Sequence, residues 1–121
     1  VSSKRKKRNN LMLKEARFTA MLTPEDRYRH YHVRFKKDVI SFMIQYETKL
    51  EGKWLPVVRY DTRHGFAHRD LINKKGKKQK TPIFARDYNE ALTFAEYDIK
   101  SNWKIYKHAF LGGIENENTE K

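Results

Sequence analysis

Hydrophobic and polar residues alternate with a period of two through the middle of the chain, which predicts β-strands. In residues 39–50, apolar side chains occupy every second position from Ile40 to Tyr46, and the opposite face carries the polar residues Ser41, Gln45 and Glu47. Polar or glycine-containing segments separate successive strands, so each strand is expected to pair with the next as an antiparallel hairpin. The same alternation predicts further strands over residues 28–36, 54–61 and 67–73.

A helical period of about 3.6 residues marks the C-terminal part of the chain. Asp87 can cap a helix, and Glu90 lies three residues further on, which is the spacing of a capping box. Apolar residues then recur on one stripe as far as Phe110. The glycine pair at 112–113 predicts the end of this helix, because glycine readily adopts the left-handed backbone that terminates helices. A short helix is also expected over residues 11–22.

Together these elements predict one α+β domain, the usual number for 121 residues. The expected fold is an antiparallel meander of about four strands, with a short N-terminal helix and a long C-terminal helix packed on one face. Its other face is left uncovered for function. Residues 1–10 are expected to be a disordered basic arm, 11–113 the domain with a lysine-rich loop at 74–80, and 114–121 a polar tail.

Positive charge changes this picture, because it is concentrated in two runs that contain no acidic residue. The chain has 27 Lys and Arg residues against 15 Asp and Glu, a net charge of +12. Removing the ten cations of the runs from the 27 leaves 17 basic residues against 15 acidic ones. The runs are Lys4, Arg5, Lys6, Lys7 and Arg8, and Lys74, Lys75, Lys77, Lys78 and Lys80.

Such runs repel themselves and bind polyanions, so they predict contact with nucleic acid, with RNA favoured over DNA, or with the ribosome. An acidic protein partner is an alternative, and so is a simple gain in solubility. A membrane partner is not expected, because neither run adjoins an apolar anchor. The absence of cysteine and of a long apolar run predicts a soluble, cytoplasmic protein without thiolate chemistry.

Candidate catalytic residues crowd residues 57–70, which cover two predicted strand ends and the turn between them. Alternation places Arg59 and Asp61 on the same face of the strand predicted over residues 54–61. It likewise places His68 and Asp70 on the same face of the strand predicted over residues 67–73. If the two polar faces align, they converge near His64 of the turn. The additional histidines at 30 and 32 join this group only if the strand order brings their strand near.

This set suits RNA cleavage without a metal. Histidine titrates near neutral pH, so His64 and His68 are candidates for the base and the acid. Asp61 and Asp70 would orient the imidazoles, and Arg59 would bind the phosphate. The same side chains could ligate a metal, but their spacing matches no zinc signature, and no metal or cofactor is expected. In the structural alternative, Asp61 accepts hydrogen bonds from turn amides, and Arg59 forms a surface ion pair with Asp70.

Residues 59–70, RYDTRHGFAHRD, resemble the R-Y-D…H…H-x-D/H core of TumE-like proteins, the toxin partners of prokaryotic toxin–antitoxin pairs. The resemblance covers residues 57–73 and the order of strands and helix. It implies interference with RNA or translation, an antitoxin-like partner that masks the basic face, and functional roles for the five candidates above. The basic arm and the 74–80 loop are not features of that family. They favour the alternative of a non-catalytic RNA-, ribosome- or DNA-binding module.

Overall fold

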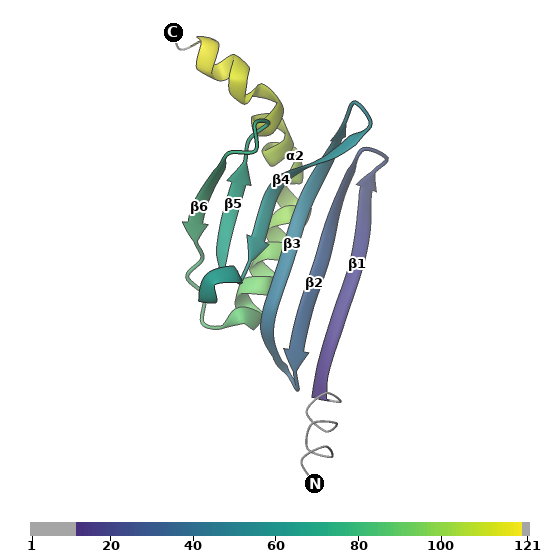
Figure 1. Cartoon of the computed structure of the whole chain (residues 1–121), viewed down its shortest axis with the longest axis vertical. Helices are drawn as coiled ribbons and strands as arrows, with labels where there is room; N and C mark the ends of the chain where they lie inside the picture. Colours follow the sequence, from purple (N-terminus) through teal and green to yellow (C-terminus); the bar gives the residue numbers. More distant parts are fainter. Residues whose placement is uncertain (1–11, 120–121) are drawn as a thin grey trace.

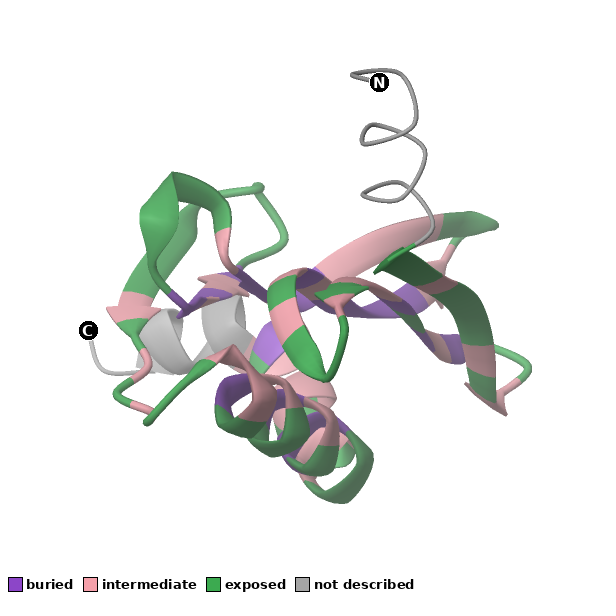
Figure 2. Cartoon of the chain, turned by 90° about the horizontal axis from the view of Figure 1, so that it is seen from below, coloured by how far each residue is buried: buried purple, intermediate pink, exposed green. Residues whose placement is uncertain are grey.

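The computed structural model describes residues 12–119, with side chains described as far as residue 112. Six strands form one antiparallel sheet in which each strand pairs with the next along the chain. A single long helix, α2, follows the strands and lies across one face of the sheet (Figures 1 and 2). The elements are β1 (Leu13–Thr23), β2 (Asp26–Phe35), β3 (Asp38–Leu50), β4 (Lys53–Asp61), η1 (Arg63–Gly65), β5 (His68–Ile72), β6 (Lys78–Pro82) and α2 (Tyr88–Thr119).

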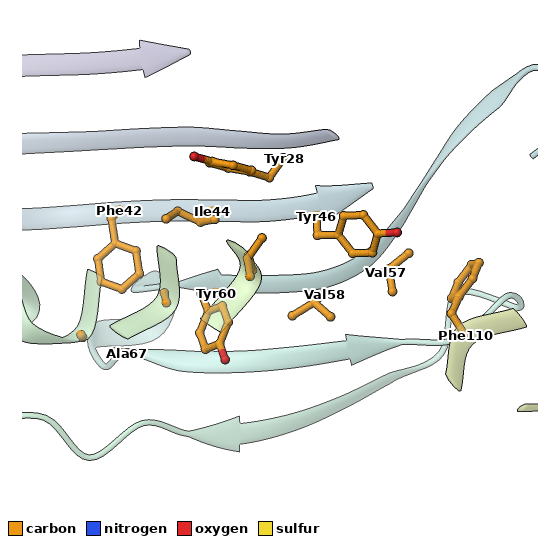
Figure 3. Close-up of a cluster of buried hydrophobic side chains, with 12 residues drawn as sticks. Tyr28, Phe42, Ile44, Tyr46, Val57, Val58, Tyr60, Ala67 and Phe110 are labelled. Atoms are coloured by element: carbon orange, nitrogen blue, oxygen red, sulfur yellow. The ribbon is translucent and has the colours of Figure 1, made fainter. Parts of the chain in front are cut away.

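The core lies between α2 and the central strands. Ile44 of β3 and Val58 of β4 are fully buried beneath the helix (Figure 3). Ile99 of α2 is fully buried in the same cluster. Ala91 and Ala95 are also buried, and their small side chains let the helix approach the sheet closely. The predicted α+β fold, a meander with a C-terminal helix on one face, is therefore confirmed. The uncovered face carries the alternate residues of every strand.

The expected N-terminal helix over residues 11–22 is wrong, because this segment forms β1. It pairs with β2 from Leu13 to Thr23, with Phe18 opposite His30 and Ala20 opposite Tyr28. The sequence there also alternates with a period of two, and the hydrogen bonds of the ladder to β2 outweigh its weak helical pattern.

The four predicted strands are present as β2 to β5, and their ends agree with the prediction within two residues. The expected lysine-rich loop at 74–80 is only partly a loop, since β6 begins at Lys78. Its turn is fixed by Asn73, whose Oδ1 accepts hydrogen bonds from the N–H groups of Lys75 and Lys77, each at 2.9 Å. Residues 1–10, the expected basic arm, lie outside the described residues.

The predicted start of the helix is confirmed, and its predicted end is wrong. The N–H of Glu90 donates to Oδ1 of Asp87 at 2.9 Å, and Oε1 of Glu90 accepts from the N–H of Arg86 at 3.0 Å. The helix continues past the glycine pair to Thr119, because Gly112 does not adopt the positive φ that terminates helices. Within residues 12–119, no helix is long and apolar enough to cross a membrane.

Candidate functional site

The candidate residues of β4 and β5 meet on the face that α2 leaves uncovered. The register of the two strands places Arg59 opposite Asp70 and Asp61 opposite His68. Tyr60, which lies between Arg59 and Asp61, is buried beneath the helix instead. The two polar faces therefore align, and the hairpin brings together the four strand residues that the sequence singled out.

His68 is the centre of this cluster and is only 1% exposed. Its Nε2 lies 2.8 Å from Oδ1 of Asp61 and 3.7 Å from Oδ2 of Asp70. Its Nδ1 lies 3.3 Å from the carbonyl oxygen of Phe66. Both ring nitrogens thus face oxygen acceptors, which fixes the plane and the position of the imidazole.

His64 lies at the solvent-exposed end of the same cluster, in the short helix η1. Its ring stacks on that of His68, with the centroids 6.2 Å apart and the planes 28° from parallel. Its φ of +75° is left-handed, and Gly65 follows with a φ of +87°. Such backbone is costly for a residue with a side chain. Asp61 stabilises it, since its Oδ1 also accepts a hydrogen bond from the N–H of Arg63 at 3.0 Å.

Arg59 is held in a row of polar contacts that crosses the open face toward β2. Its Nε donates to Oε1 of Gln45 at 2.6 Å, and Nε2 of Gln45 donates to Oε2 of Glu47 at 2.5 Å. Glu47 also accepts from Nε of Arg27 at 2.6 Å and of Arg29 at 2.9 Å. This row of arginines next to the histidine cluster offers cationic donors to a phosphate group.

Gln45 and Glu47 were not predicted to belong to a site, although both are buried on the face without a helix. Their positions two residues apart on the polar face of a strand were the available signal. One of the arginines that cover them also stacks on an aromatic ring: the guanidinium of Arg27 lies 4.1 Å from the ring centroid of Trp54. Cationic and aromatic groups side by side on a sheet are a surface suited to single-stranded nucleic acid.

The predicted nucleic-acid contacts divide into three groups in the structure. Lys80 pairs with Asp70, its Nζ lying 3.2 Å from Oδ1 of the buried carboxylate. Lys74, Lys75, Lys77 and Lys78 lie on the exposed tip of the β5–β6 hairpin. The first basic run, residues 4–8, lies outside the described residues.

His30 and His32 do not join the candidate site. They lie on the helix-covered side of β2, and β3 and β4 separate this strand from β5. Nδ1 of His30 lies 3.1 Å from Oε2 of Glu96, and its Nε2 lies 2.6 Å from Nδ1 of His32. Burial lowers the pKa of His32, and its proximity to His30 and Arg34 lowers it further. This pair therefore belongs to the interface between sheet and helix.

Asp61, His68 and Asp70 are the described residues that could hold a metal ion. Each can offer one ligand atom, and these atoms lie within 4.8 Å of one another. One imidazole nitrogen and two carboxylate oxygens are a plausible donor set. A metal bound at Nε2 would, however, replace the contact of His68 with Asp61, and the ammonium group of Lys80 already compensates the charge of Asp70. The contacts present favour hydrogen bonding over metal ligation.

Comparison with known proteins places the chain in a family without assigning it an activity. A family model described as a domain of unknown function, DUF7718, matches residues 6–116. No curated protein and no solved structure matches the chain. The family match is to a domain of unknown function and not to a named toxin family, so it does not support the resemblance of residues 57–73 to TumE-like toxins. Because the match covers most of the sequence, the chain belongs to the DUF7718 family.

Proposed function

We propose that this protein acts on RNA, and most concretely that it is a small toxin-like RNA endonuclease using histidine acid–base catalysis. One observation carries the proposal: an exposed imidazole, His64, stacks on a second imidazole, His68, that a buried carboxylate fixes in place. The cluster lies on the sheet face that α2 leaves open, beside arginines that can bind phosphate. The short resemblance to TumE-like toxins supports the same activity.

In this mechanism His64 takes the proton of an RNA 2′-hydroxyl, and the 2′-oxygen attacks the adjacent phosphorus. The bond from phosphorus to the 5′-oxygen breaks, and His68 gives a proton to the leaving oxygen. Arg59 compensates the charge that develops on the phosphate, while Asp61 and Asp70 orient His68. Because His68 is buried, the turn that carries His64 has to shift when RNA binds.

The first test is cleavage of unstructured and structured RNA by the purified protein, with and without a chelator. We expect cleavage in both conditions and a loss of about a hundredfold in His64→Gln, the typical contribution of one general acid or base. His108→Gln is the matched control, because His108 is also an exposed histidine and lies on α2. Absence of cleavage by the parent protein, or equal rates in His64→Gln and the parent, contradicts the endonuclease proposal.

The second candidate function is a non-catalytic RNA-, ribosome- or DNA-binding module, and the burial of His68 favours it. Binding would then depend on phosphate contacts from the exposed hairpin tip and from the arginines of the open face. An acidic, antitoxin-like protein that covers this surface is the proposed partner, and the cytoplasm the proposed location. In this candidate function the protein still binds nucleic acid but does not cleave it.

A salt titration tests the hairpin tip as a phosphate contact. Replacing Lys74, Lys75, Lys77 and Lys78 by glutamine is expected to flatten the slope of log K against log salt by about three for single-stranded RNA. The control variant replaces four other exposed lysines, at positions 14, 36, 37 and 53. An unchanged slope in the hairpin variant, or an equal change in the control, excludes the tip from RNA binding.

A further inference from the structure

A cavity of about 750 Å³ lies where the β5–β6 hairpin meets α2. This volume is within the range of small-molecule binding sites. The cavity borders the Ile72 end of β5, whereas the candidate RNA site lies at the His68 end of the same strand. Its walls are largely apolar and come from the sheet and the helix: Val57, Val58, Leu71, Ile72, Tyr106, Ala109 and Phe110.

The remaining lining residues give this apolar cavity a strongly cationic edge. Lys74, Lys75, Lys77 and Lys78 all border it, together with Asn73 and Gln79. Among the residues described up to position 112, the cavity lining contains these four lysines and no acidic side chain. The hydrogen bonds to Asn73 order the backbone of the turn that carries them, which places the four exposed lysines along the edge of the cavity.

We propose that this cavity binds an amphipathic anion, with an apolar body between the strands and α2 and one anionic head at the lysines. Burial of the apolar body supplies most of the affinity, because ion pairs with exposed lysines contribute little individually. The lysines select the charge of the head. Nucleic acid fits the cavity poorly, since its phosphates face solvent and need no apolar recess. The cavity shares its lysines with the RNA contacts proposed for the hairpin tip, but its apolar recess is additional to the proposed RNA function and does not rest on it.

The test compares four probes that share one alkyl chain and differ in the head: decanoate, decyl phosphate, decanol and decylamine. Titration calorimetry with the full chain is expected to show binding of at least one anionic probe, about tenfold tighter than decanol, with decylamine the weakest. Decanoate and decyl phosphate separate a carboxylate from a phosphate head. Equal binding of charged and neutral probes, or no binding of either anion, overturns the proposal.

Two variants locate the site. Ala109 lines the cavity and its side chain is exposed, so Ala109→Phe fills the space without disturbing the core. We expect it to lose anion binding about tenfold or more, whereas Ser101→Phe, an equally exposed position on α2, keeps it. The four-lysine glutamine variant should bind decanol as the parent does and lose the preference for anions. Retention of that preference, or full binding in Ala109→Phe, contradicts the assignment.

The proposed RNA site and the proposed anion-binding cavity can be tested independently of each other. Ala109→Phe is expected to retain the RNA affinity of the parent, and His64→Gln is expected to retain anion binding. Nuclear magnetic resonance gives an independent location: decanoate should shift the amide signals of Leu71 and Phe110 and leave those of η1 unchanged. Shifts confined to η1 would place the anion at the RNA site and overturn the separate cavity.

Discussion

The Asp61→Asn protein is expected to cleave RNA about a thousandfold more slowly than the parent protein. Oδ1 of Asp61 accepts from the N–H of Arg63 at 3.0 Å and lies 2.8 Å from Nε2 of His68. Asparagine removes the charge and can place an amide donor where His68 needs an acceptor. One substitution then weakens both the position of His68 and the turn that carries His64. This double effect is why the expected loss exceeds that of His64→Gln.

Asp61 acts through His68 and is therefore a positioning residue, so its test needs readouts that damage to the fold would not give. We expect kcat to fall while KM and the RNA dissociation constant stay within about twofold of the parent, because Asp61 binds no substrate. Asp38→Asn is the control, since Asp38 is an exposed carboxylate at the start of β3. A loss that appears only in KM, or the same loss in Asp38→Asn, contradicts the positioning role.

The strands were predictable where the pattern is local, and β1 was not. In β3 the apolar residues Phe42, Ile44 and Tyr46 are buried beneath the helix, as the alternation in the sequence predicts, whereas Ile40 at its start is exposed. The segment that forms β1 carries apolar residues that fit either period, and only its pairing with β2 decides between them. That pairing joins residues up to 22 positions apart, from Thr23 with Asp26 to Leu13 with Phe35, and local periodicity does not contain it.

The site was predictable to a similar extent. Asp61, His68 and their neighbours stand close together in the sequence, and a single hairpin is enough to bring them together. The position of His30 depends instead on the register of β2 against β3, which places it opposite Ile44 and beneath the helix. The contact of Gln45 with Arg59 depends on the register of β3 against β4, and the cavity beside α2 is built from four elements, β4, β5, β6 and α2. No spacing along the chain encodes such contacts directly.

The buried carboxylate of Asp26 is expected to contribute more to stability than other single polar residues of the sheet. It is 1% exposed and accepts four hydrogen bonds. Thr23 Oγ1 donates at 2.6 Å, Tyr46 OH at 2.7 Å, Thr48 Oγ1 at 2.9 Å and Lys107 Nζ at 3.0 Å. Because Lys107 belongs to α2, this carboxylate joins the first strands to the second half of the helix.

The Asp26→Asn protein is expected to lose about 3 kcal/mol of unfolding free energy at neutral pH. The asparagine amide brings donors to a position surrounded by donors, and the Lys107 ammonium group loses its counter-charge. Urea unfolding measures the loss, with an unchanged m-value as evidence that the folded state remains compact. Asp38→Asn should stay within about 0.5 kcal/mol of the parent, as exposed substitutions do. A loss below about 1 kcal/mol in Asp26→Asn contradicts the role assigned to this network.

The pH dependence of the loss tests its electrostatic part. Burial alone raises the pKa of Asp26, but the hydrogen bonds from Thr23, Tyr46, Lys107 and Thr48 outweigh it and lower the pKa below the usual 3.8. The charged carboxylate therefore stabilises the fold fully above the unfolded pKa of 3.8, and this contribution is lost as the pH falls through the lower native pKa. The difference in unfolding free energy between parent and Asp26→Asn should be constant near neutral pH. It should decrease as the pH falls below 3.8 and through the lower native pKa of Asp26. A difference that stays constant into strong acid would show that only the shape of the side chain matters, and not its charge.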